Sequence, residues 1–261
     1  MNQPFVQKTS PSVAIILVNW NSYEVSNDCI LSLKKIDYPN YTIILVDNGS
    51  ADGSGMKLRQ AHPDIVTILS DKNTGFTGGN NIGFRYSLDN NFDYSMMLNN
   101  DTFVEPDFLS KLIDLIETSD TIGAVQPRIH FDHNRQLLWN GGSYFNQFWG
   151  FTYTKGENKA PQKEHLINKE VDWITGCAFL VKNTVLQQVG LLAENMFMYS
   201  EDVDLSFRIR KNGHQLMYVA DSLIFHIAGM SNKRKTKGKD GFVNPQVHYL
   251  NQRNRIWILK K

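Results

Sequence analysis

Two nearly continuous apolar runs, rich in β-branched residues, constrain this chain more than any other feature. Residues 13–18 read Val-Ala-Ile-Ile-Leu-Val, and residues 41–46 read Tyr-Thr-Ile-Ile-Leu-Val after a helix-like stretch around residues 26–36. A run without polar alternation is typical of a strand buried on both faces, as in parallel sheets covered by helices. We therefore predict two parallel strands joined by a helical crossover.

The same alternation continues through the first hundred residues. Strands are predicted at residues 65–69 and 94–98, with a helix at 80–89 between them. This order indicates an open α/β sheet, in which ligands bind at the carboxyl ends of the strands.

The second half of the chain is less regular. Its predicted elements are a helix at 106–118, a strand at 124–131, loops or a hairpin over 139–153 and 155–169, an apolar run at 171–181, a helix at 201–211 and strands at 216–219 and 222–226. No linker divides the chain, so we expect a single domain.

Composition excludes several classes of protein. The formal net charge is +1, from 27 basic and 26 acidic residues, which argues against nucleic acid as a partner. The two cysteines, Cys29 and Cys177, lie far apart beside apolar residues and are expected to be reduced core thiols, as in a cytosolic protein. The sequence shows neither an apolar leader nor an apolar run of the roughly 18 residues that a spanning helix needs.

Polar residues follow the first two predicted strands. Asn19 and Asn21 end the first strand, and Asp47 and Asn48 end the second. An aspartate at this edge can accept a hydrogen bond from the imide of a nucleotide base. Taken alone, the sequence Asp-Asn-Gly-Ser favours a simple turn stabilised by the aspartate side chain.

Residues 73–83 combine four glycines with three asparagines and predict a loop that leads into a helix. Asn73, Gly75, Gly79 and Asn80 would offer amide groups to a ligand without adding charge. We favour ligand contact over a long helix-entry turn. The glycine spacing of a dinucleotide-binding enzyme is absent, and the first strand is not followed by a glycine-rich turn, which argues against NAD-dependent redox chemistry and nucleotidyl transfer.

The segment Asn99-Asn100-Asp101-Thr102 follows the fourth predicted strand. Its amide and carboxylate oxygens suit Mg²⁺ or Mn²⁺ carrying a diphosphate. Asp101 or Thr102 could equally cap the following helix. The segment by itself gives these two interpretations equal weight.

Adjacent acids, Glu201 and Asp202, precede an apolar helix face. Burial and like charge would raise the pKa of one of them, as a general base near neutral pH requires. Asp204 is expected to be structural, because acids are common in a first helical turn.

His226 and Arg253 are weaker candidates. His226 ends an apolar strand and would be either a metal ligand, a phosphate donor or, as is more usual, a structural histidine. Arg253 lies on a predicted helix and would contact phosphate or belong to a solvated face.

Six segments in the same order resemble the family 2 glycosyltransferases with the GT-A fold, closest to their rhamnosyltransferase-like branch. They are residues 18–21, 46–50, 73–83, 98–102, 175–178 and 199–205. The resemblance implies an open, mostly parallel nucleotide-sugar-binding sheet flanked by helices, over about residues 12–102. A mixed acceptor-side half, over about 103–261, would carry a basic loop at 232–241.

The resemblance also implies roles for individual residues. Asp47 would contact the base, Asp101 would bind the metal, and Asp202 would be the catalytic base of an inverting transfer. The family's metal motif is Asp-x-Asp, and here Asn99 stands in place of the first acid. Metal coordination would therefore come from one carboxylate, from the diphosphate and from His226.

The expected reaction is transfer of rhamnose from dTDP-rhamnose, or of another sugar from a dTDP- or UDP-sugar, to a glycan or lipid-linked glycan acceptor in cell-surface polysaccharide synthesis. The expected cofactor is Mg²⁺ or Mn²⁺, and the expected location is cytoplasmic or peripheral at the inner face of the plasma membrane. The basic run at 233–239 is a candidate for contact with anionic lipid. The rival is a non-catalytic nucleotide-sugar-binding domain of a larger glycan-synthesis assembly, suggested by Asn99 and by the end of the chain at Lys260-Lys261.

Overall fold

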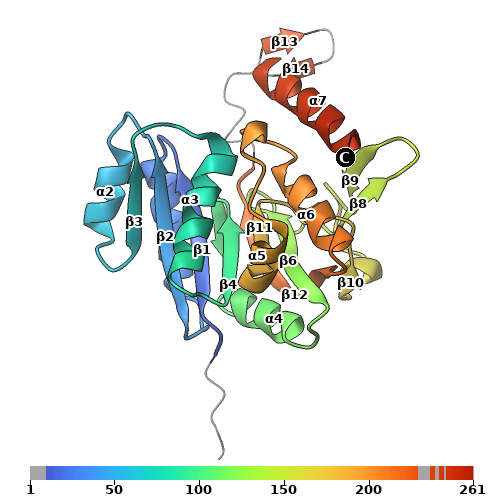
Figure 1. Ribbon diagram of the computed structural model, residues 1–261, viewed down its shortest axis with the longest axis horizontal. Coiled ribbons are helices and arrows are strands. Elements are labelled where there is room, and N and C mark those ends of the chain that lie inside the picture. The colour runs from blue at the N-terminus through green and yellow to red at the C-terminus, as the bar shows by residue number, and fades with distance from the viewer. Residues whose placement is uncertain (1–9, 229–235, 239–240, 244, 261) are drawn as a thin grey trace, which may run out of the picture.

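A computed structural model describes residues 10–228, 236–238, 241–243 and 245–260. Its main feature is a ten-stranded sheet in the order β10-β12-β6-β11-β4-β1-β2-β3, with β5 beside β12 and β7 beside β6. Helices cover both faces of this sheet (Figure 1). The prediction of an α/β fold is confirmed.

The first half forms the parallel part of the sheet. The strands β1, β2 and β3 and the strand β4 run parallel to one another. The elements are β1 (Val13–Asn19), α1 (Tyr23–Leu33), β2 (Tyr41–Asn48), α2 (Ser54–Ala61), β3 (Val66–Ser70), α3 (Gly75–Asp89) and β4 (Tyr94–Leu98). The carboxyl ends of these strands therefore share one edge, as the sequence predicted.

The second half adds antiparallel strands. β11 lies antiparallel between β4 and β6, and β12 runs parallel to β6. The elements are β5 (Thr102–Val104), α4 (Phe108–Ile116), β6 (Ile122–Phe131), β7 (Leu138–Asn140), β8 (Ser143–Asn146), β9 (Phe151–Thr154), η1 (Lys163–His165), β10 (Lys169–Glu170), β11 (Ala178–Lys182), α5 (Asn183–Val189), η2 (Glu194–Met196), α6 (Glu201–Lys211), β12 (Gln215–His226), β13 (Thr236–Gly238), β14 (Gly241–Val243) and α7 (Pro245–Leu259).

Several predicted elements of this half are confirmed. The helix at 201–211 is α6, and the region 139–153 contains most of the β8–β9 hairpin. The strands predicted at 216–219 and 222–226 are a single strand, β12, whose pairing with β6 shifts register between Val219 and Leu223. Polar residues interrupt the apolar pattern inside this strand, which is why the sequence predicted two strands.

Two apolar clusters explain the continuous run of β1. Val13, Ile15 and Leu17 point into the cluster that includes side chains of α1, α2 and α4. Ala14 and Ile16 point into the other cluster, which includes side chains of α3, α5 and α6. Because successive strand residues face opposite sides, a strand covered on both sides needs apolar residues throughout.

The glycine-rich segment 73–83 is mostly helix: the predicted loop is wrong for residues 75–79, and the helix predicted at 80–89 is confirmed. α3 begins at Gly75. A Cβ at Gly79 would lie 2.7 Å from Val18 Cγ1, and one at Gly83 would lie 2.3 Å from Ile16 Cγ2. These glycines, one helical turn apart, let α3 pack close against β1, so the local composition reflects helix–strand contact.

Further expectations bear on the organisation of the chain. The predicted boundary at 102/103 stays a prediction, and one sheet runs across it. Cys29 and Cys177 are free and buried. Most of the basic run at 233–239 lies outside the described residues.

Of the helices in the described part of the chain, none has both the length and the apolar character needed to cross a bilayer.

Candidate functional site

The ends of β1 and β2 form a buried polar cluster. Asn19 Nδ2 donates hydrogen bonds to Asp47 Oδ1 at 2.7 Å and to Ser54 Oγ at 2.8 Å. Ser50 Oγ donates to the same carboxylate oxygen of Asp47 at 2.6 Å. A Cβ at Gly55 would lie 2.2 Å from Asp47 Cγ, so glycine is needed there for the aspartate to fit. Asp47 is thus fixed as a hydrogen-bonded carboxylate at the edge of the sheet.

A hydrogen-bond chain links this cluster to the end of β4. Asn100 Nδ2 donates to Ser26 Oγ at 2.7 Å, and Ser26 Oγ donates to Asn19 Oδ1 at 2.8 Å. Asn21 adopts a left-handed conformation, with φ of 50°, and its side-chain oxygen accepts the Ala51 amide at 2.9 Å. The strand ends that the sequence singled out are therefore physically connected.

Asn48 and Asn73 shape the entry to α3. Asn48 Nδ2 donates to Asn73 Oδ1 at 3.1 Å and to the Gly75 carbonyl at 2.9 Å, and its side-chain oxygen accepts the Thr74 amide at 3.0 Å. Asn73 Oδ1 also accepts the Gly75 amide. Asn80 is buried and donates to the Phe76 carbonyl within α3. These amides make internal hydrogen bonds at the edge where the sequence predicted ligand contacts.

Asp101 and His226 lie side by side. β5 pairs antiparallel with β12, which aligns His226 with Thr102, and the Ile227 amide donates to the Asp101 carbonyl at 3.0 Å. His226 Nε2 lies 3.0 Å from Asp101 Oδ1 and 3.3 Å from Asn99 Nδ2. Both side chains are buried, and α4 begins only after β5. Asp101 therefore does not cap a helix.

The protonation of His226 reflects these neighbours. Burial opposes the charged imidazolium, but Cys177 and the hydrogen bond to Asp101 outweigh burial and raise the pKa of His226 to about 10. The edge of the Trp139 indole covers the imidazole, with ring centroids 4.6 Å apart. His226 is thus held in place by an acid, a thiol and an aromatic ring.

The donor set fits a divalent cation in part. Among the described residues, no three His, Cys, Asp or Glu side chains gather closely enough to hold a metal ion by themselves. The Asp101 carboxylate and the Asn99 side-chain amide nevertheless provide ligand types that Mg²⁺ and Mn²⁺ accept, and the His226 imidazole would join them once it gives up its proton. A cation here would need further oxygen ligands from another molecule, as a diphosphate would supply.

Glu201 and Asp202 begin α6. Glu201 is only 4% exposed, whereas Asp202 is partly exposed. Burial, followed by the charge of Asp202, raises the pKa of Glu201 well above its ordinary value, and Glu201 Oε2 finds no hydrogen-bond partner among the described residues. Burial also raises the pKa of Asp202, but the Gly176 amide, 2.8 Å from Oδ2, and the Val203 amide stabilise its carboxylate. Asp202 is therefore the acid of this pair that ionises first.

The turn at Gly176 and Cys177 connects the Asp101–His226 pair with the Glu201–Asp202 pair. The backbone amide of Asn99 donates to the Cys177 carbonyl at 2.8 Å, and the backbone amide of Gly176 donates to the Asp202 carboxylate. Burial raises the pKa of the Cys177 thiol, His226 lowers it, and the charges of Asp101 and Asp202 raise it further. The turn at Gly176 and Cys177 is thus hydrogen-bonded both to Asp202 and to Asn99, two residues before Asp101.

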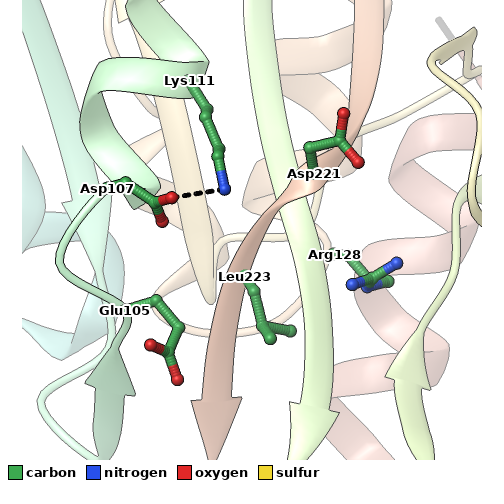
Figure 2. Close-up of a pocket in the computed structure, with 6 residues that line it drawn as sticks. All are labelled: Glu105, Asp107, Lys111, Arg128, Asp221 and Leu223. Atoms are coloured by element: carbon green, nitrogen blue, oxygen red, sulfur yellow. Dashed lines mark ion pairs between the residues drawn. The ribbon is translucent and has the colours of Figure 1, made fainter.

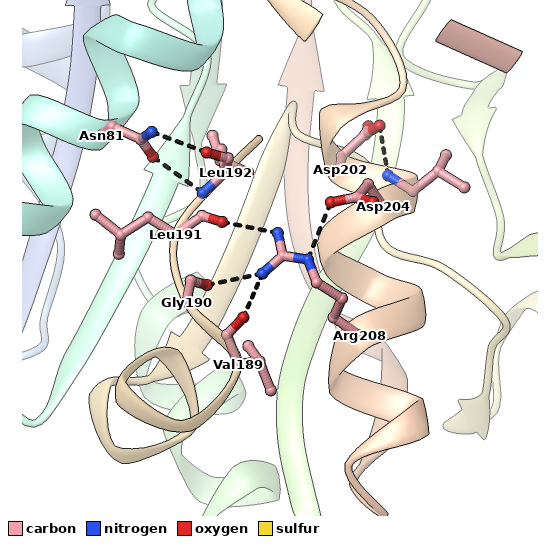
Figure 3. Close-up of polar contacts among 9 residues, drawn as sticks. Asn81, Val189, Gly190, Leu191, Leu192, Asp202, Asp204 and Arg208 are labelled. Atoms are coloured by element: carbon pink, nitrogen blue, oxygen red, sulfur yellow. Dashed lines mark hydrogen bonds and ion pairs between the residues drawn. The ribbon is translucent and has the colours of Figure 1, made fainter. Parts of the chain in front are cut away.

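Arg208 fixes the position of α6 (Figure 3). Its guanidinium pairs with Asp204 at 2.9 Å and donates to the carbonyls of Val189, Gly190 and Leu191 at 2.6–3.0 Å. The side chain of Asn81 exchanges two hydrogen bonds with the backbone of Leu192, which ties the same turn to α3. The structural role expected for Asp204 agrees with this geometry.

The loop before α6 is held by Asn254, which no sequence pattern singles out. Phe197, Tyr199 and Ser200 have positive φ angles of 62°, 70° and 67°, an uncommon conformation for residues other than glycine. Asn254 Nδ2, buried on α7, lies within 3.1 Å of the carbonyl oxygens of Met196, Met198 and Tyr199. An isolated asparagine on a polar helix gives no sequence signal for such a contact.

Arg253, expected either to contact phosphate or to belong to a solvated face, lies beside Asn254. Its guanidinium donates to the carbonyls of Asn195 and Met196, at 3.2 and 2.9 Å, and lies over the Trp257 ring at 4.4 Å. These contacts dock α7 on the loop before α6. Arg253 is therefore engaged in contacts within the protein.

A surface depression of about 580 Å³ lies elsewhere (Figure 2). Its lining consists of Glu105, Asp107, Lys111, Arg128, Asp221 and Leu223, and Asp107 pairs with Lys111. None of the side chains predicted to bind a ligand lines it. Size alone does not identify a site, and the buried acids at the strand ends offer the better chemistry.

Comparison with known proteins agrees with the sequence resemblance. The family model described as Glycosyl transferase family 2 matches residues 14–190. The low-salt glycan biosynthesis hexosyltransferase Agl10 of Haloferax volcanii is 31% identical over 79% of this chain and 64% of its own length. The N-acetylglucosaminyl-diphospho-decaprenol L-rhamnosyltransferase of Mycobacterium tuberculosis is 26% identical over 80% of this chain and 72% of its own length.

A solved structure shares the fold. The mannosyltransferase PcManGT from Pyrobaculum calidifontis, in complex with GDP-Man and Mn²⁺, superposes with a TM-score of 0.62 at 15% identity, over 85% of this chain and 59% of that one. The expected GT-A architecture is thereby confirmed. This chain spans less than two thirds of the length of the archaeal hexosyltransferase and of the mannosyltransferase.

Proposed function

Because this chain belongs to glycosyl transferase family 2, we propose that it is an inverting hexosyltransferase that uses a nucleotide-sugar in glycan synthesis. The observation that carries the proposal is the turn at Gly176 and Cys177, which binds the Asp202 carboxylate on one side and the end of β4, next to Asp101, on the other. A base for the acceptor and an anchor for the leaving group are thus held by one rigid turn.

Asp47, Asn19 and Asn100 form the donor end of the proposed site. The hydrogen-bonded carboxylate of Asp47 retains the capacity to accept a further hydrogen bond from a base. Asn21, Asn48, Asn73, Gly75, Gly79 and Asn80 surround this edge, and we assign them to shaping the donor pocket. Arg253 is assigned to the acceptor side through its contacts with the loop before α6.

Asp202 is the proposed general base. It would take the proton of an acceptor hydroxyl while that oxygen forms a bond to the anomeric carbon, and the bond from this carbon to the diphosphate oxygen breaks on the opposite face. Glu201 would support this step by holding its own proton, because its pKa is raised more strongly by burial. Because protonated Glu201 is neutral, it places no negative charge beside the Asp202 carboxylate.

Asp101, with the side-chain amide of Asn99 and with His226 once its proton is displaced, would hold Mg²⁺ or Mn²⁺. Such an ion neutralises the charge that develops on a departing diphosphate. The support is the chemistry of the donor set and the Mn²⁺ in the similar mannosyltransferase structure.

The proposed donor is dTDP-rhamnose or a related dTDP- or UDP-sugar, and the proposed acceptor is a glycan or lipid-linked glycan of a cell-surface polysaccharide. The support is the similarity to the mycobacterial enzyme, whose name specifies an L-rhamnosyl transfer to a diphospho-decaprenol carrier. We place the reaction at the cytoplasmic face of the membrane that holds such a carrier.

A donor panel tests this proposal. The protein is mixed with Mn²⁺ and dTDP-rhamnose, UDP-sugars or GDP-mannose, and its unfolding temperature is measured. A donor at about 100 times its Kd should raise the midpoint by roughly 5–10 °C. The stabilising donor is then incubated with a lipid-linked glycan, and the released nucleoside diphosphate is quantified. Donor binding without turnover on any acceptor would favour a non-catalytic sugar-nucleotide-binding domain.

The Asn254→Ala substitution should lower kcat by roughly ten- to a hundred-fold with little change in donor affinity. It removes the buried donor shared by three carbonyl oxygens of the strained loop before Glu201, and leaving such groups unpaired costs about 1–3 kcal/mol each. The acid limb of the pH–rate profile should also move, because this loop sets the surroundings of Asp202.

The matched control is Asn212→Ala, which removes a side-chain hydrogen bond to Gln188 at the other end of α6. It should leave kcat and the pH profile unchanged. If Asn254→Ala altered only the unfolding temperature, Asn254 would have no positioning role.

A further inference from the structure

Large apolar side chains are exposed where the β8–β9 hairpin meets α7. Phe148 and Trp149 at the hairpin tip are 85% and 66% exposed. The other exposed members of this surface, called here the hairpin–helix face, are Phe151, Tyr153, Tyr249, Ile256 and Leu259. Both elements lie at the end of the molecule opposite α2 and β3 (Figure 1). Apolar patches of this kind mark interaction surfaces.

The hairpin–helix face is built as one unit. Arg255 donates to the carbonyls of Gly150 and Trp149 at 2.9 and 3.0 Å. A Cβ at Gly150 would lie 2.8 Å from Leu259 Cδ2, so the hairpin tip sits directly on the last turn of α7. Phe148 and Trp149 stack edge to face with centroids 4.9 Å apart. These contacts hold the backbone of the hairpin tip against α7, and the side chains of Phe148 and Trp149 are exposed there.

The charged residues of the hairpin and of the α7 segment are all basic. Residues 143–154 and 241–261 contain no aspartate or glutamate, whereas the whole chain has 26 acidic residues. α7 and the residue after it supply Arg253, Arg255 and Lys260, and the last two are exposed. Aromatic side chains beside basic ones are the composition that binds the interface of an anionic bilayer. Two copies of this face would bring like charges together, which disfavours a symmetric dimer.

A groove lies between this face and the start of α6. Its volume is about 140 Å³, and its walls include Phe151 and Leu259 of the face. Ser200 and Val203, which flank Glu201 and Asp202, also line it. An acceptor carried at a lipid surface would therefore arrive at the start of α6, the helix that carries the proposed base.

We propose that the hairpin–helix face binds the surface of an anionic lipid bilayer and thereby presents the site to a lipid-borne acceptor. The second part rests on the proposed function, whereas binding to lipid does not. The contact is peripheral: aromatic side chains enter the interface, and Arg255 and Lys260 meet anionic headgroups.

The test is sedimentation of the full chain with sucrose-loaded vesicles of phosphatidylcholine alone or with 30% phosphatidylglycerol. The wild-type protein should bind the anionic vesicles, and high salt should weaken this binding. The double variant Phe148→Ser/Trp149→Ser should bind at least about ten-fold more weakly, since each aromatic residue loses its burial in the interface. The control, Met56→Ser/Leu69→Ser, removes exposed apolar residues at the opposite end and should bind normally.

Activity separates this inference from the proposed function. The double variant should hydrolyse the donor, or use a soluble acceptor, at the wild-type rate, and should lose rate only with acceptor embedded in vesicles. Equal vesicle binding by the wild type and the double variant would overturn the inference. So would a dimer that dissociates in the double variant without any vesicle binding, because a second copy would then be the partner.

Discussion

Replacing Asp202 with asparagine is expected to lower the rate of sugar transfer by roughly 10²–10⁴-fold while donor binding is retained. The amide keeps the size of the side chain and one acceptor for the Gly176 amide, but it cannot take a proton from the acceptor hydroxyl. Single-turnover transfer with the donor found in the panel gives the rate, and the ligand-dependent rise in unfolding temperature gives the binding. Full activity in this variant would remove Asp202 as the base.

The matched control is Asp107→Asn. Asp107 also stands at the start of a helix, α4, but it faces the surface depression shown in Figure 2 and pairs with Lys111. Its replacement should change the transfer rate by less than about two-fold, because the helix dipole and surface ion pairs have small effects on a distant site.

The pH dependence of the wild-type rate follows from the same assignment. A base works when it is deprotonated, so the rate should be present above the pKa of Asp202 and should fall as the pH drops through it. Burial raises this pKa above the ordinary aspartate value, which moves the acid limb toward neutral pH. Asp202→Asn should abolish this limb from whatever activity remains.

Asp101→Asn should reduce transfer by roughly 10²–10³-fold, and chelation of divalent ions should do the same to the wild type. The variant keeps the backbone bond from Ile227 but removes the one carboxylate of the proposed metal site. Binding of Mn²⁺ with nucleoside diphosphate, followed by the electron paramagnetic resonance of free Mn²⁺, should weaken in the variant.

The chelated wild type separates a metal effect from damage to the fold. Its donor binding should disappear and should return when Mn²⁺ or Mg²⁺ is added back. The His226→Asn variant then tests whether the imidazole is a metal ligand. Loss of a ligand lowers the affinity for Mn²⁺, and this affinity can be measured in a protein that has no transferase activity. Donor binding that persists in chelator would show that Asp101 acts without a metal.

The regular elements of the first half were predictable because their causes are local. The apolar runs of β1 and β2 and the acids that open α6 each lie within a dozen residues. The glycine-rich segment misled the prediction of secondary structure at residues 75–79. Gly79 and Gly83 are small where side chains of β1 pack against α3. A glycine reports close approach, but the sequence does not say whether a ligand or a strand approaches.

The polar residues at the strand ends could be found from the sequence, but the residues that they contact could not. Asp101 was equally a helix cap or a metal ligand until the β5–β12 pairing placed His226 beside it. Asn99 and His226 are 127 residues apart in the chain. Contacts at that separation depend on how the whole sheet is assembled, and no local pattern encodes them.

The sequence by itself determined the fold class, the polar edge of the sheet and the identity of the candidate acids. Only the tertiary structure decided how these acids are held: Gly176 stabilises the Asp202 carboxylate, and Asn254 of α7 fixes the loop before it. The physical reason is that hydrophobic periodicity is a property of neighbouring residues. The proton affinity and position of a carboxylate depend instead on burial, charges and hydrogen-bond donors that arrive from distant segments.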